Sequence, residues 1–288
     1  MRRIVCREFG PVDRLAVVEE PDPSPGPGEV LVAVAAAAVS FVDGLVVRGR
    51  YQVRPPLPHT PGSAVAGRVA AVAPLPDGVA APVAAAAVES YSTLAFALEH
   101  RVRVRPGEWV LVLGAGGGIG LAAVDVCRAA GARVVAAAST EAERTAARAA
   151  GAQVAVGYDA LKDRVREVTG GGADVVVDPV GGPPAEPALR SLTAYGRYCV
   201  LGFAAGEIPR LPANLVLLRN RGVVGVDWGD WARTRPEDAV ALLTGVLGRV
   251  ARGELRPPEP TGLPPERAAE ALTPLAHREV VGKLVLVP

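Results

Sequence analysis

The sequence contains few cysteines, few aromatic residues and no excess of charge of either sign. Its three cysteines, Cys6, Cys127 and Cys199, lie far apart and form no C-x-x-C pair. This spacing excludes a disulfide-stapled scaffold and a four-cysteine zinc lobe, and it fits a reducing compartment. We therefore expect a cytoplasmic protein.

Charge and hydrophobic runs exclude two further classes of partner. The chain has 31 basic and 30 acidic residues and a net charge of +1, so no basic face for a phosphate backbone or an anionic membrane surface is expected. The start, MRRIVCREFGPVDR, has no apolar stretch after its basic residues, and no uninterrupted apolar run reaches the roughly 18 residues of a membrane span. We expect neither nucleic acid nor a membrane as a partner.

With 288 residues, the chain is long enough for two domains that each bury a core. The first third is rich in proline and glycine and carries short β-branched runs, which are typical of a small all-β unit. From about residue 90, strands alternate with helices, which predicts a doubly wound parallel sheet. We expect one domain over 1–89 and 257–288 and a second over 90–256. The predicted strands are 29–39, 67–73, 109–113, 133–137 and 154–156, with two more in ADVVVDPVGG and GRYCVLGFAAG and a final one in the tail EVVGKLVLVP, which returns to the first domain. The predicted helices are 92–101, 120–130, 141–150 and 161–168.

The most specific motif is GAGGGIG at 114–120, between a predicted strand and a predicted helix. Gly114, Gly117 and Gly120 give the spacing G-x-x-G-x-x-G. Glycines at such a turn let the backbone approach a pyrophosphate, which then receives N–H groups at the positive end of the helix dipole. The alternative is a tight turn with no ligand. The surrounding strand–helix–strand pattern favours dinucleotide binding.

The residues about 20 positions after the glycines favour NADP over NAD. Ser139 and Thr140 stand where an acidic side chain would bind the ribose 2′-hydroxyl of NAD, and Arg144 follows. Neither hydroxyl repels a 2′-phosphate. The alternative is purely structural, because Thr140 and Glu143 have the spacing of a helix capping box and Arg144 then becomes a solvated helix residue.

Motifs along nearly the whole chain make the sequence similar to the medium-chain dehydrogenase/reductase superfamily, in its zinc-free quinone oxidoreductase (zeta-crystallin-like) branch. They are GEVLVAV, SFVD, PLPHTPGS, GAGGGIGLAAV, DVVVDPVGG, GRYCVLGFAAGEIPRLPANL and GKLVLVP. The resemblance implies a GroES-like β-barrel domain built from both chain ends and a Rossmann domain, with the active site in the cleft between them.

The resemblance also implies hydride transfer from NADPH to a quinone or a conjugated enone. By this match, the pyrophosphate lies on Gly117, Gly118 and Ile119. The adenine end lies near Ser139, Thr140 and Tyr158, and the nicotinamide lies beside Gly202 and Phe203. Without the resemblance, Tyr158 is an ordinary half-buried tyrosine after a strand.

Two positions depart from the family pattern. Ser40 stands where the branch has the asparagine of N-F-x-D, and Ala64 stands where it has the glutamate of PG-x-E. A hydroxyl still donates one hydrogen bond, so Ser40 and Tyr51 are the candidate contacts to the substrate. The zinc-binding relatives place Cys and G-H-E at the points that carry Ser40 and GSA here. His59 stands alone, so we expect no catalytic zinc.

The stretch AAVAPLPDGVAAP at 70–82 predicts a shortened first domain. In the family, further barrel strands follow the GRVAAVA strand, whereas here Ala73 is followed at once by PLPDG. One hypothesis is a working reductase with an open site for a bulky ring. The other is a non-redox cyclase or lyase, or a nucleotide-sensing protein, that keeps the fold without hydride transfer. Unpaired barrel edges need cover, either from a partner subunit or from the alanine-rich run at 79–88. The β-branched run at 222–229 predicts a homodimer, in which Trp228 and Trp231 either anchor the contact or belong to the core or the lining of a pocket.

Overall fold

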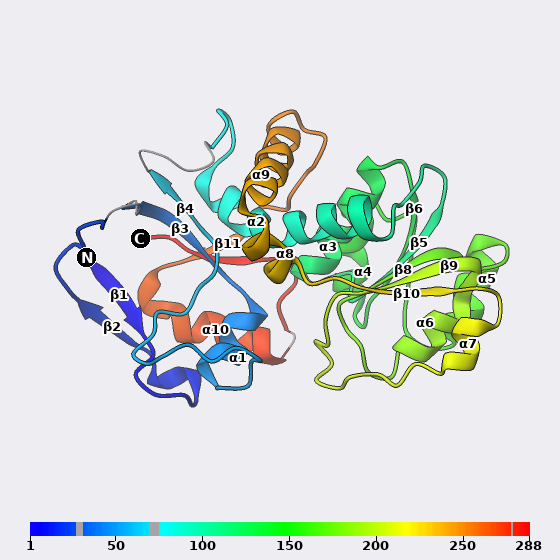
Figure 1. The fold of residues 1–288 in the computed structure, drawn as a ribbon, viewed down its shortest axis with the longest axis horizontal. Helices are drawn as coiled ribbons and strands as arrows, with labels where there is room; N and C mark the ends of the chain where they lie inside the picture. The colour runs from blue at the N-terminus through cyan, green and yellow to red at the C-terminus, as the bar shows by residue number, and fades with distance from the viewer. Residues whose placement is uncertain (27–30, 69–74, 278) are drawn as a thin grey trace. The chain divides into compact units, whose positions relative to one another are not determined.

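The computed structural model describes residues 1–26, 31–68, 75–277 and 279–288. The chain divides into two compact units, Met1–Glu89 with Pro258–Pro288, and Ser90–Pro257. The sequence placed the second boundary one residue earlier. Each unit has strands and helices of its own (Figure 1). Each also has its own buried cluster of apolar side chains.

The second unit is built on a six-stranded parallel sheet in the order β10-β9-β8-β5-β6-β7. This is the doubly wound arrangement expected from the sequence, and β5 and β8 are neighbours although they are not consecutive. Such a point of reversal is where ligands bind at the carboxyl ends of the strands. The strands are β5 Trp109–Leu113, β6 Arg133–Ala137, β7 Val154–Val156, β8 Ala173–Asp178, β9 Leu192–Val200 and β10 Gly222–Gly225.

Helices cover this sheet, and the central strands are therefore apolar without alternation. Val110, Leu111 and Val112 are all fully buried, as in a sheet covered on both faces. The predicted strands at 109–113, 133–137 and 154–156 are confirmed. The helices are α3 Gly118–Ala129, α4 Glu141–Ala149, α5 Leu161–Thr169, α6 Ala185–Ser191, α7 Ala213–Leu217, α8 Trp228–Thr234 and α9 Pro236–Ala251.

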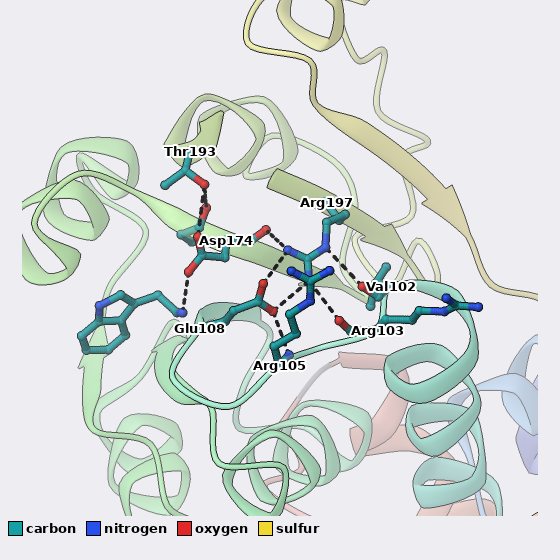
Figure 2. Close-up of polar contacts among 9 residues, drawn as sticks. Val102, Arg103, Arg105, Glu108, Asp174, Thr193 and Arg197 are labelled. Atoms are coloured by element: carbon teal, nitrogen blue, oxygen red, sulfur yellow. Dashed lines mark hydrogen bonds and ion pairs between the residues drawn. The ribbon is translucent and has the colours of Figure 1, made fainter. Parts of the chain in front are cut away.

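A polar network fixes the amino ends of the central strands (Figure 2). Arg197 donates to both Glu108 carboxylate oxygens at 2.8 and 2.9 Å and to the Val102 and Arg103 carbonyls at 3.2 Å. Asp174 accepts from the backbone N–H of Trp109 at 2.8 Å. Burial is the largest single effect and would raise the pKa of Glu108, but the hydrogen bonds from Arg197 and the Arg105 N–H, together with the charges of both arginines, outweigh it and the pKa is lowered. The polar side chains at this end of the sheet therefore stabilise the fold.

The first unit contains a four-stranded sheet in the order β11-β12-β3-β4 and a separate two-stranded sheet, β1-β2. The final strand β12 pairs antiparallel with β3, so the predicted return of the chain's tail to the first domain is confirmed. Helices α1 and α10 pack against each other beside this sheet. The elements are β1 Arg2–Val5, β2 Ala16–Glu19, β3 Ala33–Val39, α1 Phe41–Val47, β4 Val65–Arg68, β11 Thr261–Leu263, α10 Ala268–His277 and β12 Leu284–Leu286.

Strand β4 forms one edge of the four-stranded sheet. The predicted strand at 67–73 begins within β4, and its other residues, 69–73, lie outside the described residues. The predicted deletion point, between Ala73 and Pro74, falls in 69–74, outside the described residues.

The alanine-rich stretch before residue 90 is a helix. The predicted helix at 92–101 is part of the same helical run but begins too late. Helix α2 runs over Ala81–Ala95 and continues into the π-helix η2, Phe96–Arg101. Alanine has the highest helix propensity, and Ala85 and Ala86 pack with Ala36 and Val285 of the sheet. The run Ala81–Arg101 is long and apolar enough to cross a membrane by length and composition, but 67% of its most apolar window is buried inside the protein.

Candidate nucleotide-binding site

The glycine turn lies between β5 and α3, and two of its three predicted glycines are required by close packing. Gly114 has φ +60°, and a Cβ there would lie 2.7 Å from Cγ2 of Val180. A Cβ on Gly120 would overlap the carbonyl oxygen of Gly114 and lie 2.6 Å from Cα of Ala115. These glycines close the turn onto itself and onto the loop after β8.

Gly117 differs because its open side faces no protein atom at close range. A Cβ there would meet only the Gly114 carbonyl oxygen, at 3.6 Å. Gly117 is the N-cap of α3 and has no side chain to accept the first N–H groups of that helix. Within the described residues, the N–H groups of Gly118, Ile119 and Gly120 have no hydrogen-bond acceptor. A pyrophosphate fits this cradle, because it accepts N–H groups at the positive end of a helix.

Gly116 is part of the turn, although the sequence reading did not single it out. A Cβ on Gly116 would overlap Cβ and Cγ of Glu143 and lie 2.9 Å from Cα of the same residue. In the sequence, only the glycine-rich run GAGGGIG indicates that Gly116 belongs to the turn. The first turn of α4 therefore packs directly on the glycine turn.

Thr140 is the N-cap of α4 in a complete capping box with Glu143. The N–H of Glu143 donates to Thr140 Oγ1 at 3.2 Å, and the N–H of Thr140 donates to Glu143 Oε2 at 2.8 Å. The structural alternative for Thr140 is thus confirmed. Ser139 and Thr140 are exposed at the carboxyl end of β6, where a ribose is expected.

Arg144 braces the same turn and is not a freely solvated helix residue. Its Nη1 donates to the Ala138 and Ser139 carbonyls at 2.9 and 3.1 Å, and its Nε donates to Glu141 at 2.9 Å. Arg148 also donates to Glu141, and these two hydrogen bonds lower the pKa of the Glu141 carboxyl. Within the described part of the chain, Arg144 Nη2 donates to no acceptor, so it is available to an anion at this turn.

Tyr158 uses its hydroxyl to hold the glycine turn in place. The N–H of Gly114 donates to this hydroxyl at 2.9 Å, and the hydroxyl donates to the Ala137 carbonyl at 3.3 Å. Tyr158 thus joins the carboxyl ends of β5 and β6. A contact between its ring and an adenine stays a prediction.

A buried carboxylate that the sequence did not single out joins the loop after β8 to strand β9. Asp178 accepts the N–H groups of Val180 and Gly181 at 2.7 and 2.8 Å and the Tyr198 hydroxyl at 2.6 Å. Burial raises the pKa of Tyr198, and the neighbouring Asp178 charge raises it further. The motif DVVVDPVGG contains this aspartate, but the alternation of strands and helices along the sequence predicts only that it ends a strand.

The segment of Gly202 and Phe203 pairs with the loop after β8. The N–H groups of Ala204 and Ala205 donate to the Pro179 and Val180 carbonyls at 3.1 and 2.7 Å. Both predicted nicotinamide contacts therefore stand at the carboxyl end of the sheet, in the same unit as the glycine turn. Their contact with a nicotinamide stays a prediction.

The candidate substrate residue Ser40 is buried, with 7% of its surface exposed, at the start of α1. Its Oγ accepts the N–H of Asp43 at 3.2 Å, and its own N–H donates to Asp43 Oδ2 at 2.8 Å. A hydrogen bond from the Ser40 side chain also stabilises the ionised carboxyl of Asp43. Tyr51 lies beyond the end of α1 and is half-buried.

Asp43 is a buried acid in a charged environment. Burial raises its pKa to about 6, against the lowering effect of its hydrogen bonds with Ser40. The carboxylate of Glu89 raises the pKa of Asp43 further, and the ammonium of Lys283 lowers it. Lys283 Nζ lies 3.9 Å from Glu89 Oε2.

We expect Asp43→Asn to stabilise the protein above pH 6 but not in acid. The Asp43 pKa rises from about 3.9 in an unfolded chain to about 6 in the folded protein. The folded state therefore holds the Asp43 proton more tightly than the unfolded chain does. The protonated carboxyl contributes to stability at low pH, and this contribution is lost as the pH rises to 6 and above. The variant should gain on the order of 2 kcal/mol relative to the wild type between pH 4 and pH 8. Urea unfolding of both proteins at the two pH values measures this, and a constant difference would contradict it.

The candidate zinc positions carry no ligand cluster in the described part of the chain. No group of three or more His, Cys, Asp or Glu side chains stands close enough there to hold a metal ion. His59 pairs through its backbone with Cys6, with N–H to carbonyl distances of 2.7 and 2.9 Å. Ala64 is buried beside β4, and its carbonyl accepts the N–H of Ala38.

Two family models match the sequence. The one described as "Alcohol dehydrogenase GroES-like domain" matches residues 26–180, and the one described as "Zinc-binding dehydrogenase" matches residues 118–245. Quinone oxidoreductase-like protein 2 of Rattus norvegicus is 34% identical over 285 positions, which cover 86% of this chain and 81% of the relative. The homolog from Nematostella vectensis is 30% identical, with 86% and 78% covered.

The last alignment bears on the predicted shortening. It runs over 289 positions, more than the 288 residues of this chain, although it includes only 86% of them. The relative therefore carries residues inside the aligned stretch that this chain lacks.

Solved structures give the same relationship. A probable oxidoreductase from Mycobacterium abscessus has a TM-score of 0.88 and 32% identity, with 100% of this chain and 99% of that chain covered. The quinone oxidoreductase from Thermus thermophilus, which was also solved in complex with NADPH, has a TM-score of 0.85 and 31% identity, with both chains fully covered. With its six-stranded parallel sheet and GroES-like domain, the chain belongs to the quinone oxidoreductase-like branch of the medium-chain dehydrogenase/reductase superfamily.

Proposed function

We propose that the protein is an NADPH-dependent oxidoreductase that reduces a quinone or a conjugated enone. The observation that carries the proposal is the open cradle at Gly117, where the N–H groups of Gly118 and Ile119 have no acceptor among the described residues. Support comes from related proteins described as quinone oxidoreductases, including one solved with NADPH. The test is to mix the protein with NADPH and a panel of quinones and enones and to follow the absorbance of reduced nicotinamide. Binding of NADPH without its oxidation by any member would contradict the proposal.

In this proposal, bound NADPH supplies a hydride to the conjugated system of the substrate. The chain's own residues orient the substrate carbonyl and stabilise negative charge on its oxygen. The hydroxyl of Ser40 and the phenol of Tyr51 are the donors that we assign to this oxygen. Water can donate the proton that the resulting enolate takes up, so no dedicated general acid or general base is needed. If Ser40→Ala and Tyr51→Phe both kept the wild-type kcat/KM across the panel, this assignment would be wrong.

We propose that Arg144 sets a preference for NADPH over NADH. A charge-assisted hydrogen bond to the 2′-phosphate contributes about 1.5 to 3 kcal/mol, so Arg144→Ala should lower the ratio of the two affinities at least tenfold. Arg148→Ala is the matched control, because Arg148 shares Glu141 but is 46% exposed and, within the described residues, forms no bond to the turn carbonyls. Calorimetric titration with both nucleotides measures the ratio. Equal affinities of the wild-type protein for NADPH and NADH would contradict this proposal.

We propose that the protein acts without zinc. Ser40, Ser63 and Ala64 replace the side chains that bind the metal in the zinc-dependent relatives. Treatment with a chelator should therefore leave the melting temperature and the rate of NADPH oxidation unchanged. Stoichiometric zinc in the purified protein, lost together with activity, would show the reverse.

A second candidate function is a nucleotide-binding protein without redox turnover, either a sensor or a non-redox cyclase or lyase. The observation that favours it is the commitment of Ser40 to a helix cap, together with the missing amide and glutamate of the family pattern. The same absorbance experiment separates the two functions. A protein that binds NADPH tightly but oxidises it with none of the substrates in the panel supports the second candidate.

We propose that the protein forms a homodimer in the cytoplasm. The edge strand β10 presents Val223 at 42% exposure, and Leu217 and Leu218 before it are 77% and 59% exposed. Unpaired edges and exposed apolar side chains favour association. The three cysteines are free and buried, as expected in a reducing compartment. Light scattering should give a dimer at micromolar concentration and a monomer for Val223→Glu, and a wild-type monomer would overturn the dimer.

A further inference from the structure

A surface cavity of about 490 Å³ lies within the Ser90–Pro257 unit. It is formed by the end of α2, the π-helix η2, and the helices α8 and α9. Helices α2, α8 and α9 neighbour each other in Figure 1. None of its lining residues belongs to the glycine turn or to the loops after β6, β8 and β9. The lining is Ala95, Glu99, His100, Trp231, Arg235, Asp238, Ala241, Leu242, Gly245, Val246 and Arg249.

The ring-bearing residues of the lining are held by further aromatic contacts. Trp231 stacks on Phe96 with ring centroids 4.6 Å apart and an interplanar angle of 27°. His100 stacks on the same Phe96 at 5.9 Å, and Trp228 meets Trp231 edge to face at 6.3 Å. A ring held on several sides loses little freedom when a ligand stacks on it. Trp231 is therefore a preorganised stacking surface.

Helix α9 keeps the cavity open by contributing small residues. A Cβ on Gly245 would have no atom within 4 Å, although Gly245 lies in the helix interior. Glycine there costs the helix about 1 kcal/mol relative to alanine. Ala95 and Ala241 are the other small members of the lining. Gly245 and Ala241 are exposed, so the side of the cavity that α9 forms is open.

The charged residues of the lining are already paired. Arg249 lies 2.9 Å from Glu99, and Arg235 lies 3.6 Å from Asp238. An ionic ligand would have to compete with one of these pairs, whereas an uncharged ligand would leave both intact. The widened turn of η2 carries both Glu99 and His100 of the lining, and such turns are frequent at functional sites.

We propose that this cavity binds an uncharged, planar aromatic molecule of one or two fused rings, stacked on Trp231. The stacking face, the unfilled space beside Gly245 and the balanced charges all fit this class of ligand. The site is separate from the residues assigned to NADPH, so it does not depend on the proposed function.

The test uses 2-naphthol as the probe and the whole protein without any nicotinamide cofactor. Calorimetry should show saturable binding, and the tryptophan fluorescence should change with the same dissociation constant. Naphthalene-2-sulfonate, an anion of similar shape, should bind at least tenfold more weakly. Binding that does not saturate up to the solubility limit, or equal affinity for the anion, would overturn the proposal.

Substitutions on α9 locate the binding. Gly245→Leu should fill the cavity and weaken 2-naphthol binding at least tenfold. Val240→Leu is the matched control, because Val240 is on the same helix, is 48% exposed and does not line the cavity. Ala241→Leu is a second filling variant in case Gly245→Leu lowers the melting temperature. Wild-type affinity in a folded filling variant would show that the probe binds elsewhere, and the proposal would fail.

Discussion

Gly120→Ala should abolish nucleotide binding and destabilise the protein. The added Cβ would overlap the carbonyl oxygen of Gly114 and lie 2.6 Å from Cα of Ala115. Both are backbone atoms, so no side-chain rotation relieves the clash and the turn must open. Overpacking of this kind costs about 3 kcal/mol. We expect at least a hundredfold loss of NADPH affinity and a lower urea midpoint.

Gly117→Ala is the matched control because it separates binding from folding. Its Cβ would have 3.6 Å to the nearest atom of the protein, so the urea midpoint should stay near the wild-type value. The same Cβ enters the cradle in front of Gly118 and Ile119, so affinity for NADPH should still fall. A Gly120→Ala protein with wild-type affinity would refute the assignment of this turn. Wild-type affinity in Gly117→Ala would show that the pyrophosphate lies elsewhere.

The Rossmann unit was predictable from sequence because its local signals and its tertiary structure agree. The runs at 109–113 and 133–137 are continuous and apolar, and glycine-rich or capping turns bound them, so strand ends coincide with the sequence pattern. Helix α4 begins at Glu141 because Thr140 and Glu143 form the capping box that the spacing indicates. In such segments no distant contact has to be known.

The first unit and the details of the site were less predictable because they depend on specific contacts that no residue pattern indicates. Helix α2 begins at Ala81, and its alanines gave no amphipathic pattern to mark the start. Arg144 binds carbonyls that its own turn presents, and Asp178 collects donors from Val180, Gly181 and Tyr198. A one-dimensional pattern identifies these residues as polar, but it does not say which groups they meet.

Asp178→Ala is expected to have the second large effect, on both the fold and the cofactor loops. The carboxylate is 1% exposed and accepts two backbone N–H groups and the Tyr198 hydroxyl. Its removal leaves three donors without their acceptor, and hydrogen bonds to a charged group contribute about 1.5 to 3 kcal/mol each. We expect a loss of about 4 kcal/mol in the free energy of unfolding, measured by urea titration.

A comparison with Tyr198→Phe shows which part of that loss comes from the loops. The phenylalanine removes only the hydroxyl and leaves the N–H groups of Val180 and Gly181 bonded to Asp178. It should therefore cost about 1 to 2 kcal/mol and keep NADPH affinity. Asp178→Ala should lower that affinity as well, because Pro179 and Val180 carry the carbonyls that hold the segment after Gly202 and Phe203. Equal losses of stability in the two variants, with NADPH binding intact in both, would show that Asp178 serves only the Tyr198 hydroxyl and does not position the loops.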